Sequence, residues 1–309
     1  MLGGSNHTTT QHPKDNIEMS TTKTPGGTFT TTEGPTLTRM GYGAMQLAGP
    51  RVWGPPKDRG EAIAVLRTAV EAGVNHVDTA DFYGPHVTNE IIREALAPYD
   101  GVHIVTKVGS VRDEDGGWPH ARSPRQLREQ VESNLRTLGV EALDVVNLRV
   151  GGGPDGHSPV PGSIAEPFGA LAQMRQEGLI RHLGLSVVDA GQVAEAQSIA
   201  PVVTVQNWYN VAHRGDEELI ASLEAQGISY VAFWPLGGFN PLQSGVLDRV
   251  AENLGTSPKA VAIAWLLHRA PNIVVIPGTS SVAHLRENLA AAGLQPPAGA
   301  LTALDGIAA

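Results

Sequence analysis

The sequence contains no cysteine, and this absence excludes several kinds of chemistry at once. None of its 309 residues can form a disulfide, act as a thiolate nucleophile or supply a sulfur ligand to zinc or to an iron–sulfur cluster. The 11 histidines form no HExxH motif and no pair at the spacing of a metal site. We therefore expect a fold without covalent cross-links and a site without a metal ion.

Basic residues are also few relative to acidic ones. The chain has 22 Lys and Arg against 31 Asp and Glu, a formal charge of −9, and no basic run. Nucleic acids and anionic membranes attract clusters of positive charge, so we expect neither as a partner. No apolar run approaches the roughly 20 residues of a membrane span, and the first residues show no signal-peptide pattern. These absences favour a cytoplasmic protein.

The beginning of the chain differs from the rest. Residues 1–33 are rich in Thr, Ser, Asn and Gly, and a segment with so few apolar residues cannot offset the entropy lost on ordering. We expect an N-terminal extension without stable structure over residues 1–33, followed by a single domain over residues 34–309. Phe29 and Leu37 flank a turn signal at Gly34–Pro35, which favours a short hairpin around the boundary.

From residue 36 onward, short apolar segments alternate with amphipathic ones. Several amphipathic segments begin with helix-capping residues, such as Asp58 three residues before Glu61 and Ser123 before Pro124. The apolar segments are too continuous to be half-exposed, which is typical of parallel strands covered on both faces. The segments that we expect to be strands are residues 37–46, 74–80, 103–108, 143–148, 181–186, 201–207, 228–234 and 272–277. Eight strand–helix units predict an α/β fold of the (β/α)8 TIM-barrel class.

Four polar residues stand at or just after the ends of predicted strands. Asp78 and Tyr83 follow the second strand, Lys107 ends the third, and Arg149 ends the fourth. In a barrel, the carboxyl ends of the strands meet at one mouth, where active sites lie. Each charged residue alone is most simply explained by a salt bridge at this mouth. The three together, with a tyrosine in reach, favour a catalytic site instead.

These residue types suit proton transfer by a phenol. A free phenol has a pKa of about 10, and an adjacent ammonium stabilises the phenolate. A carboxylate paired with the lysine would hold the ammonium in place and keep it charged. An arginine nearby can polarise a carbonyl group. Such a set predicts the donation of a proton to an oxygen atom that is receiving electrons.

Several strings of the sequence resemble those of the aldo-keto reductases. VNHVDTADFYG, TK, LDVVNLR, GLS, VQN, AFWPLG and IPGTSSVAHLRENL occur in the order typical of that family, and the resemblance runs from about residue 36 to 295. GYGAMQLAGP and FYGPHVTNEIIREAL are most similar to the pyridoxal reductase subgroup, which reduces pyridoxal with NADPH. The resemblance implies a barrel fold, NADPH as the cofactor in preference to NADH, and a small carbonyl compound as the substrate.

The resemblance also implies roles for the catalytic residues. Tyr83 matches the general acid of the family, Lys107 the cation beside it, and Asp78 the partner of that lysine. The family usually has histidine where this chain has Arg149. Because the pyridoxal reductase subgroup also carries arginine there, we interpret the change as altered recognition of the carbonyl group.

The residues implied for the cofactor fall into two groups. Ser186 and Gln206 match residues that bind the nicotinamide carboxamide, and Phe233 matches the aromatic residue that stacks on the nicotinamide ring. The usual asparagine after the serine is Val187 here, so one amide contact is missing. No GxGxxG or GxxxxGK[ST] motif is present, so we expect the phosphates near the last predicted strand. There the resemblance implies a phosphate- and adenine-binding set of Thr279, Ser280, His284, Arg286 and Asn288.

Two functions remain open at this point. The first is the NADPH-dependent reduction of an aldehyde or ketone to the alcohol, with pyridoxal or a related heterocyclic or aromatic aldehyde as the candidate substrate. The alternative is a weakly active nicotinamide-binding barrel that serves as a redox-responsive binding subunit, since the usual histidine and asparagine are missing. Three tryptophans at predicted strand ends or loops are expected to form a wall for a flat substrate: Trp53, Trp118 and Trp234.

Overall fold

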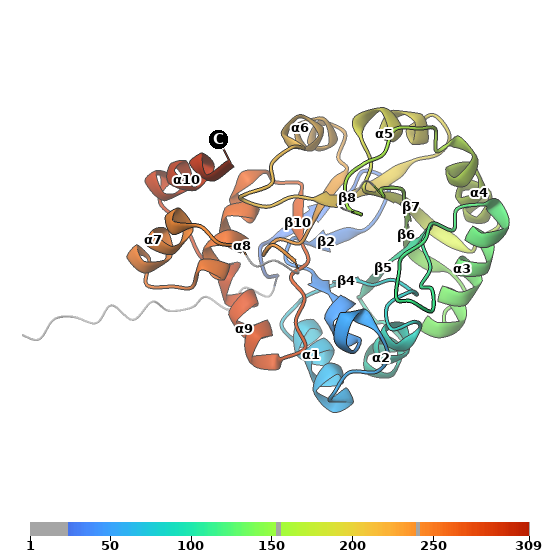
Figure 1. Cartoon of the computed structure of the whole chain (residues 1–309), viewed down its shortest axis with the longest axis horizontal. Coiled ribbons are helices and arrows are strands. Elements are labelled where there is room, and N and C mark those ends of the chain that lie inside the picture. The colour runs from blue at the N-terminus through green and yellow to red at the C-terminus, as the bar shows by residue number, and fades with distance from the viewer. Residues whose placement is uncertain (1–23, 153–155, 239–241, 309) are drawn as a thin grey trace, which may run out of the picture.

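Eight parallel strands form one sheet in the computed structural model, which describes residues 24–152, 156–238 and 242–308. Their order in the sheet follows their order in the chain, from β3 to β10 (Figure 1). Each extends no more than one residue beyond a predicted segment. The segment predicted over residues 37–46 is not one strand, because Thr36–Thr38 pairs in a separate hairpin, Tyr42–Gly43 is the barrel strand and Ala44–Leu47 is a 3₁₀ helix. The strands are β3 (Tyr42–Gly43), β4 (His76–Asp78), β5 (His103–Val108), β6 (Leu143–Arg149), β7 (Ile180–Ser186), β8 (Val202–Trp208), β9 (Ser229–Phe233) and β10 (Ile273–Val275).

Backbone hydrogen bonds close this sheet into a barrel. The N–H of Gly41 donates to the carbonyl of Val275 at 2.8 Å, and the N–H of Val275 donates to the carbonyl of Arg39 at 2.8 Å. Met40 and Val275 thereby form a parallel bridge between the first and last strand segments. The predicted barrel class is confirmed.

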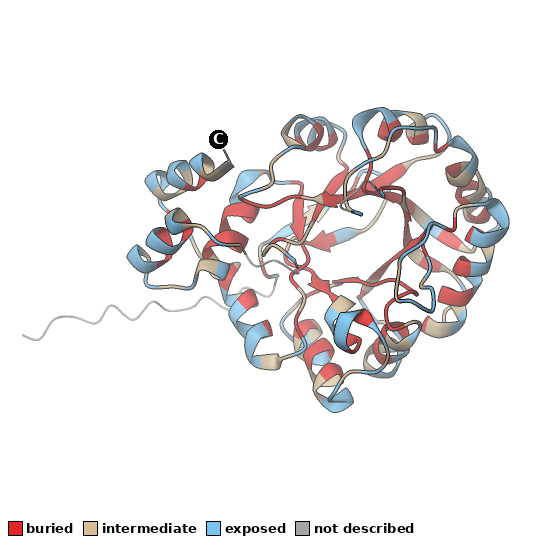
Figure 2. Cartoon of the chain, in the orientation of Figure 1, coloured by how far each residue is buried: buried red, intermediate tan, exposed pale blue. Residues whose placement is uncertain are grey.

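Helices surround the barrel, and their buried faces point toward the strands (Figures 1 and 2). The expected caps are present: Asp58 accepts a hydrogen bond from the N–H of Glu61 at 2.9 Å, and Ser123 forms a capping box with Gln126. No helix among residues 24–152, 156–238 and 242–308 is long and apolar enough to cross a membrane. The helices that follow the barrel strands are α1 (Arg59–Glu71), α2 (Val87–Leu96), α3 (Pro124–Leu138), α4 (Ala165–Gln176), α5 (Ala190–Gln197), α6 (Glu217–Ala225), α8 (Pro258–Arg269) and α9 (Val282–Ala291).

Two further helices were not predicted. α7 (Gly245–Asn253) and α10 (Ala298–Asp305) pack against each other, and α7 also packs against α8, at one side of the barrel (Figure 1). They contain 9 and 8 residues. Helices this short are marginal on their own and depend on tertiary packing. The equally short α5 (Ala190–Gln197) was expected because it follows a predicted strand, whereas α7 and α10 lie outside the eight strand–helix units.

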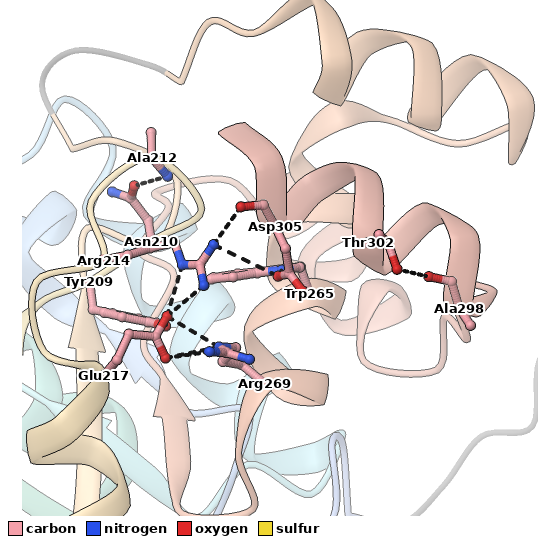
Figure 3. A network of polar contacts seen from close by, with 10 residues as sticks. All are labelled: Tyr209, Asn210, Ala212, Arg214, Glu217, Trp265, Arg269, Ala298, Thr302 and Asp305. Atoms are coloured by element: carbon pink, nitrogen blue, oxygen red, sulfur yellow. Dashed lines mark hydrogen bonds and ion pairs between the residues drawn. The ribbon is translucent and has the colours of Figure 1, made fainter. Parts of the chain in front are cut away.

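A polar network holds α10 against the barrel helices (Figure 3). Asp305 accepts a hydrogen bond from the indole of Trp265 at 2.9 Å, and its backbone carbonyl accepts one from Arg214 at 2.7 Å. Arg214 and Arg269 both donate to the carboxylate of Glu217. The network therefore joins α6, α8 and α10.

The amino ends of the strands form the base of the barrel, where the expected hairpin lies. β1 (Thr28–Thr30) pairs antiparallel with β2 (Thr36–Thr38), and Phe29 lies opposite Leu37. The boundary expected at residue 34 therefore lies inside the hairpin, whose first strand is ordered by pairing with the second. Thr32 contributes by donating its N–H to the carbonyl of Gly227 at 2.9 Å. Residues 1–23 lie outside the described residues.

Candidate active site

A cavity of about 750 Å³ opens at the carboxyl ends of the strands. We call it the mouth cavity. Its lining combines the ends of β3, β4, β5, β6, β8 and β9 with the loops that follow them. Six of the twelve predicted site residues line it: Asp78, Tyr83, Lys107, Arg149, Gln206 and Phe233.

The ammonium group of Lys107 is the centre of the site. It donates to Asp78 Oδ1 at 2.5 Å, to the backbone carbonyl of Thr79 at 3.0 Å and to Tyr83 Oη at 3.2 Å. Lys107, Asp78 and Tyr83 are 5%, 3% and 7% exposed. Burial by itself lowers the pKa of Lys107, but the Asp78 carboxylate and the Tyr83 hydroxyl raise it above its ordinary value. The buried lysine is therefore an ammonium ion.

Neighbouring parallel strands bring these groups together. Asp78 ends β4 and pairs with Val105 of β5, so Lys107 lies just beyond it on the next strand. Tyr83 follows in a tight turn, in which its N–H donates to the carbonyl of Ala80 at 3.0 Å. The tyrosine hydroxyl is thus fixed beside the ammonium and at the cavity wall.

A network of buried side-chain hydrogen bonds holds Thr79, at the start of that turn, in place. The hydroxyl of Thr79 donates to Asn89 Oδ1 at 2.9 Å, and the Asn89 amide donates to Asn134 Oδ1 at 3.0 Å. Thr106 donates to the same Asn134 oxygen at 2.7 Å. Since the backbone carbonyl of Thr79 also binds Lys107, this network determines where the ammonium group lies.

Gln206 and Ser186 add two unsatisfied polar groups beside the same carboxylate. The Gln206 amide donates to Asp78 Oδ2 at 2.7 Å, so both carboxylate oxygens are occupied. Gln206 Oε1 and Ser186 Oγ are buried without a partner, and the two residues pair in register across β7 and β8. A buried acceptor and a buried hydroxyl match the NH₂ and C=O of a carboxamide. The residues present therefore fit the nicotinamide end of a dinucleotide. Gln206 and Phe233 line the mouth cavity, whereas Ser186 does not.

Arg149 places a second cation at the mouth cavity. One guanidinium nitrogen donates to the carbonyl of Gly156 at 3.0 Å and lies 3.2 Å from His157 Nδ1. Its Cζ lies 6.0 Å from the centre of the Phe233 ring. Burial lowers the pKa of Arg149, but a guanidinium remains protonated in proteins. Arg149 therefore presents fixed positive charge to the mouth cavity.

The residues expected around the cofactor phosphates lie on and before α9, and none of them lines the mouth cavity. Thr279 and Asn288 are buried, whereas Ser280, His284 and Arg286 are exposed. The first turn of α9 is already in contact with an acidic residue, because the N–H of Val282 donates to Glu61 Oε1 at 2.9 Å. Sequence reasoning missed this contact, since Glu61 belongs to α1 and has no sequence relation to α9.

Other cavity residues come from the loops. Trp118 and Trp234 of the predicted aromatic wall line the cavity, whereas Trp53 does not and is 42% exposed. Sequence reasoning missed His120 and His157, which also line it. Their position in loops after predicted strands was the only available signal. The described residues contain no cluster of three His, Asp or Glu that could hold a metal ion.

The sequence of residues 39–309 matches the Aldo/keto reductase family, and the chain belongs to this family of oxidoreductases. It is 60% identical over 272 residues to pyridoxine 4-dehydrogenase of Escherichia coli (strain K12), covering 88% of this chain and 95% of that relative. An uncharacterized oxidoreductase of Schizosaccharomyces pombe (strain 972 / ATCC 24843) is 40% identical, over 87% of this chain and 86% of its own length. The family resemblance of the sequence is confirmed.

Solved structures share the barrel. A thermostable aldo-keto reductase in complex with the inhibitor epalrestat superposes with a TM-score of 0.76 at 28% identity, over 91% of this chain and 99% of its own. An aldo-keto reductase from Klebsiella pneumoniae in complex with NADPH superposes with a TM-score of 0.74 at 24% identity, over 90% of this chain and 94% of its own.

Proposed function

We propose that this protein catalyses the NADPH-dependent reduction of pyridoxal, or of a related heterocyclic or aromatic aldehyde, to the alcohol. The observation that carries the proposal is the buried Tyr83 hydroxyl, 3.2 Å from the Lys107 ammonium at the wall of the mouth cavity. The 60% identity to a pyridoxine 4-dehydrogenase supports the choice of substrate, because that relative's name describes the same alcohol–aldehyde pair.

The cofactor supplies the hydride when it is bound. Ser186 and Gln206 would hold its carboxamide, since each has a buried oxygen atom without a partner. Phe233 would cover the nicotinamide ring. Thr279, Ser280, His284, Arg286 and Asn288 would bind the phosphate and adenine end, and the two basic residues among them favour NADPH over NADH.

The chain's own residues manage the proton. Tyr83 donates its hydroxyl proton to the substrate oxygen as that oxygen gains electrons, and Lys107 stabilises the phenolate that is left. Asp78 holds the lysine in place and balances its charge. Arg149 orients the carbonyl group by donating hydrogen bonds to it. The alternative function, a weakly active binding subunit, rests only on the missing histidine and asparagine, whereas Tyr83, Lys107 and Asp78 are all present and in contact.

The test is the steady-state oxidation of NADPH in the presence of pyridoxal by wild type and Tyr83→Phe. We expect turnover to fall by roughly 10²–10⁴-fold, as for the loss of a general acid, while NADPH binding measured by fluorescence persists. Tyr99→Phe is the matched control, because its hydroxyl donates to the carbonyl of Leu138, away from the cavity. Near wild-type turnover in Tyr83→Phe would remove Tyr83 from the mechanism.

A further inference from the structure

The loop between β5 and α3, residues 109–122, is paired with itself. The N–H of Val111 donates to the carbonyl of Pro119 at 3.1 Å. Arg112 follows the first of these residues in the chain, and Trp118 precedes the second. The paired backbone therefore places the side chains of Arg112 and Trp118 next to each other.

The guanidinium of Arg112 contacts two tryptophan rings. Its Cζ lies 3.9 Å from the centre of the Trp118 ring and 5.2 Å from the centre of the Trp53 ring. Both distances are within the roughly 6 Å over which a cation is attracted to an aromatic face. Nη2 donates to the carbonyl of Arg51 at 3.3 Å, whereas Nε and Nη1 are buried without a hydrogen-bond partner. The rings therefore supply the electrostatic contact that these two nitrogens do not receive from an acceptor.

The acidic residues next to Arg112 in the sequence do not determine where its guanidinium lies. Three of them, residues 113–115, follow it directly. Within the described part of the chain, none of their carboxylates is within ion-pair distance of the guanidinium. Asp113 instead accepts a hydrogen bond from the N–H of Gly117. An exposed acidic run is thus available to Arg112, and its side chain lies against the indoles instead.

Trp118 in turn lies against the tyrosine of the site. Its ring centre is 6.3 Å from that of Tyr83, with an angle of 80° between the ring planes, and 5.5 Å from that of Phe82, with an angle of 86°. Edge-to-face pairs are favourable at these distances. Trp118, Tyr83 and Phe82 line the mouth cavity, whereas Arg112 and Trp53 do not. Because Arg112 covers one face of the Trp118 indole, a substrate in the cavity can meet only its edges and its other face.

Trp53 is attached to the same tyrosine turn through the backbone. Trp53 and Gly84 form a parallel bridge, and the N–H of Gly54 donates to the carbonyl of Gly84 at 2.8 Å. Gly84 directly follows Tyr83 in the chain. Arg112 therefore links two indoles that are both held at the turn that carries the tyrosine. We call Trp53, Arg112 and Trp118 the Trp–Arg–Trp brace.

We propose that Trp118 is the surface against which the flat ring of the substrate lies beside Tyr83, and that Arg112 is a positioning residue that holds this surface in place. Arg112 does not line the cavity, so it acts on the substrate through the indole. The proposal rests on the proposed function and specifies the part of the substrate that is recognised. An aromatic or heterocyclic ring can stack on the indole, whereas a short aliphatic aldehyde gains much less from it.

The test compares a ring aldehyde with an aliphatic one. We measure kcat and KM with NADPH for pyridoxal and for butanal, in wild type, Arg112→Met and Trp118→Leu. We expect the ratio of kcat/KM for pyridoxal to that for butanal to fall about 3- to 30-fold in Arg112→Met, as for a lost cation–π contact. The change should lie in KM for pyridoxal, because Tyr83 and Lys107 are untouched. An unchanged ratio in both Arg112→Met and Trp118→Leu would overturn the proposal.

Two further variants of Arg112 and one control complete this series. Arg112→Lys should restore part of the ratio, because an ammonium is also attracted to an aromatic face. Arg112→Gln, which is polar but uncharged, should resemble Arg112→Met. Arg125→Met is the control, because Arg125 lies on α3 with its side chain 87% exposed. A ratio that falls as far in Arg125→Met as in Arg112→Met would contradict a specific role for the brace.

A double variant tests whether Arg112 acts through the indole. If it does, Arg112→Met should change the pyridoxal-to-butanal ratio in wild type but not in Trp118→Leu, since coupled residues are not additive. Trp118→Phe, which keeps a smaller aromatic ring, provides a second background for the same comparison. Effects of the two substitutions that simply multiply would overturn the assignment of Arg112 as a positioning residue.

Calorimetric titration of pyridoxine in the presence of NADPH separates this proposal from the proposed function. Both compounds are in the reduced form, so no hydride transfer takes place and binding is measured without turnover. Pyridoxine binding that weakens in Arg112→Met but not in Arg125→Met supports the brace even if pyridoxal is not reduced, in which case the proposed function fails alone. Equal binding by wild type, Arg112→Met and Trp118→Leu overturns the brace and leaves the proposed function standing.

Discussion

The two ends of the barrel differ in the charge of their buried titratable groups. At the mouth, Lys107 is a buried ammonium that is held by a carboxylate, a carbonyl and a hydroxyl. At the base, His76 is fully buried on the neighbouring strand, and neither of its ring nitrogens has a partner. Burial, followed by the charges of His103 and Lys107, lowers the pKa of His76 to about 3. Of these two buried groups, only Lys107, which has hydrogen-bond partners, is charged at neutral pH.

The backbone differs between the two ends in the same sense. At the base, Arg39 donates to the carbonyls of Leu267, Ala270 and Ile273 at 2.6, 2.7 and 3.0 Å. Among the described non-glycine residues there, one, Tyr99 in the loop before β5, has a φ in the left-handed region, at 68°. The loops at the mouth contain non-glycine residues in the left-handed region, which is disfavoured for L-residues. These residues are Arg51, Val52, His86, Val187 and Trp234. Strain of this kind concentrates at functional sites, and five of the six strained non-glycine residues in the described part of the chain lie at the end of the barrel where we propose the active site.

The largest effect is expected from a substitution that breaks the Lys107–Asp78 ion pair at the mouth. Asp78→Asn leaves the Lys107 ammonium buried without its counter-ion, so we expect a loss of about 3–5 kcal/mol in the free energy of unfolding. Asp78→Asn combined with Lys107→Met removes both charges and should be more stable than Asp78→Asn alone, but inactive. Urea denaturation and NADPH turnover measure the two quantities.

The control for that experiment is Asp144→Asn. Asp144 pairs with Arg181, whose side chain is 61% exposed, and exposed pairs contribute less than about 1 kcal/mol. Asp144 Oδ2 also accepts from the N–H of Ile104 at 3.2 Å, and the amide oxygen of asparagine can accept the same hydrogen bond. Equal losses of stability in Asp78→Asn and Asp144→Asn would contradict the view that the buried pair is held by its own partners.

The second-largest effect concerns the pH dependence of stability that we attribute to His76 at the base. The pKa of His76 is about 3 in the folded protein and about 6.5 in an unfolded chain. Below about pH 6.5 only the unfolded state binds the proton, so stability falls as the pH decreases, by about 1.4 kcal/mol per unit. His76→Phe should remove this part of the dependence.

Urea denaturation at pH 7 and pH 4 measures that difference in wild type and His76→Phe. The loss of about 3 kcal/mol expected for His76 between these values should persist in His268→Gln, because His268 is exposed on α8. A similar loss in His76→Phe would show that other groups cause the acid sensitivity.

The smallest effect concerns the strained residue beside Ser186. Val187 has a φ of 59°, a conformation that asparagine adopts more readily than a β-branched residue. Val187→Asn should bind NADPH about 2- to 10-fold more tightly, as for one added hydrogen bond. Val187→Thr keeps the branched shape and lacks the amide, so it serves as the control in the same fluorescence titration. Weaker NADPH binding by Val187→Asn than by Val187→Thr would exclude the added contact.

The fold and the meeting of polar residues at the mouth could be predicted because both depend on order along the chain. Each barrel strand is a buried apolar segment, and Asp78, Lys107 and Arg149 stand at strand ends, which parallel pairing brings to one mouth. The pairing within the loop of residues 109–122 could not be predicted, because Ser110 and His120 come together only through hydrogen bonds inside that loop. The contact between Glu61 and α9 was equally inaccessible, since it joins elements far apart in the sequence.

The bridge between Met40 and Val275 has a consequence for the order of folding. Adjacent strands such as β5 and β6 follow each other in the chain, whereas closure needs segments from near the two ends of the sequence. Contacts of high sequence separation form slowly, since a large loop must close first. During synthesis, the edge at residues 39–41 stays unpaired until β10 emerges, and an open edge can pair with another copy of the chain. The hairpin of β1 and β2, which needs only local contacts, forms next to that edge at the very start.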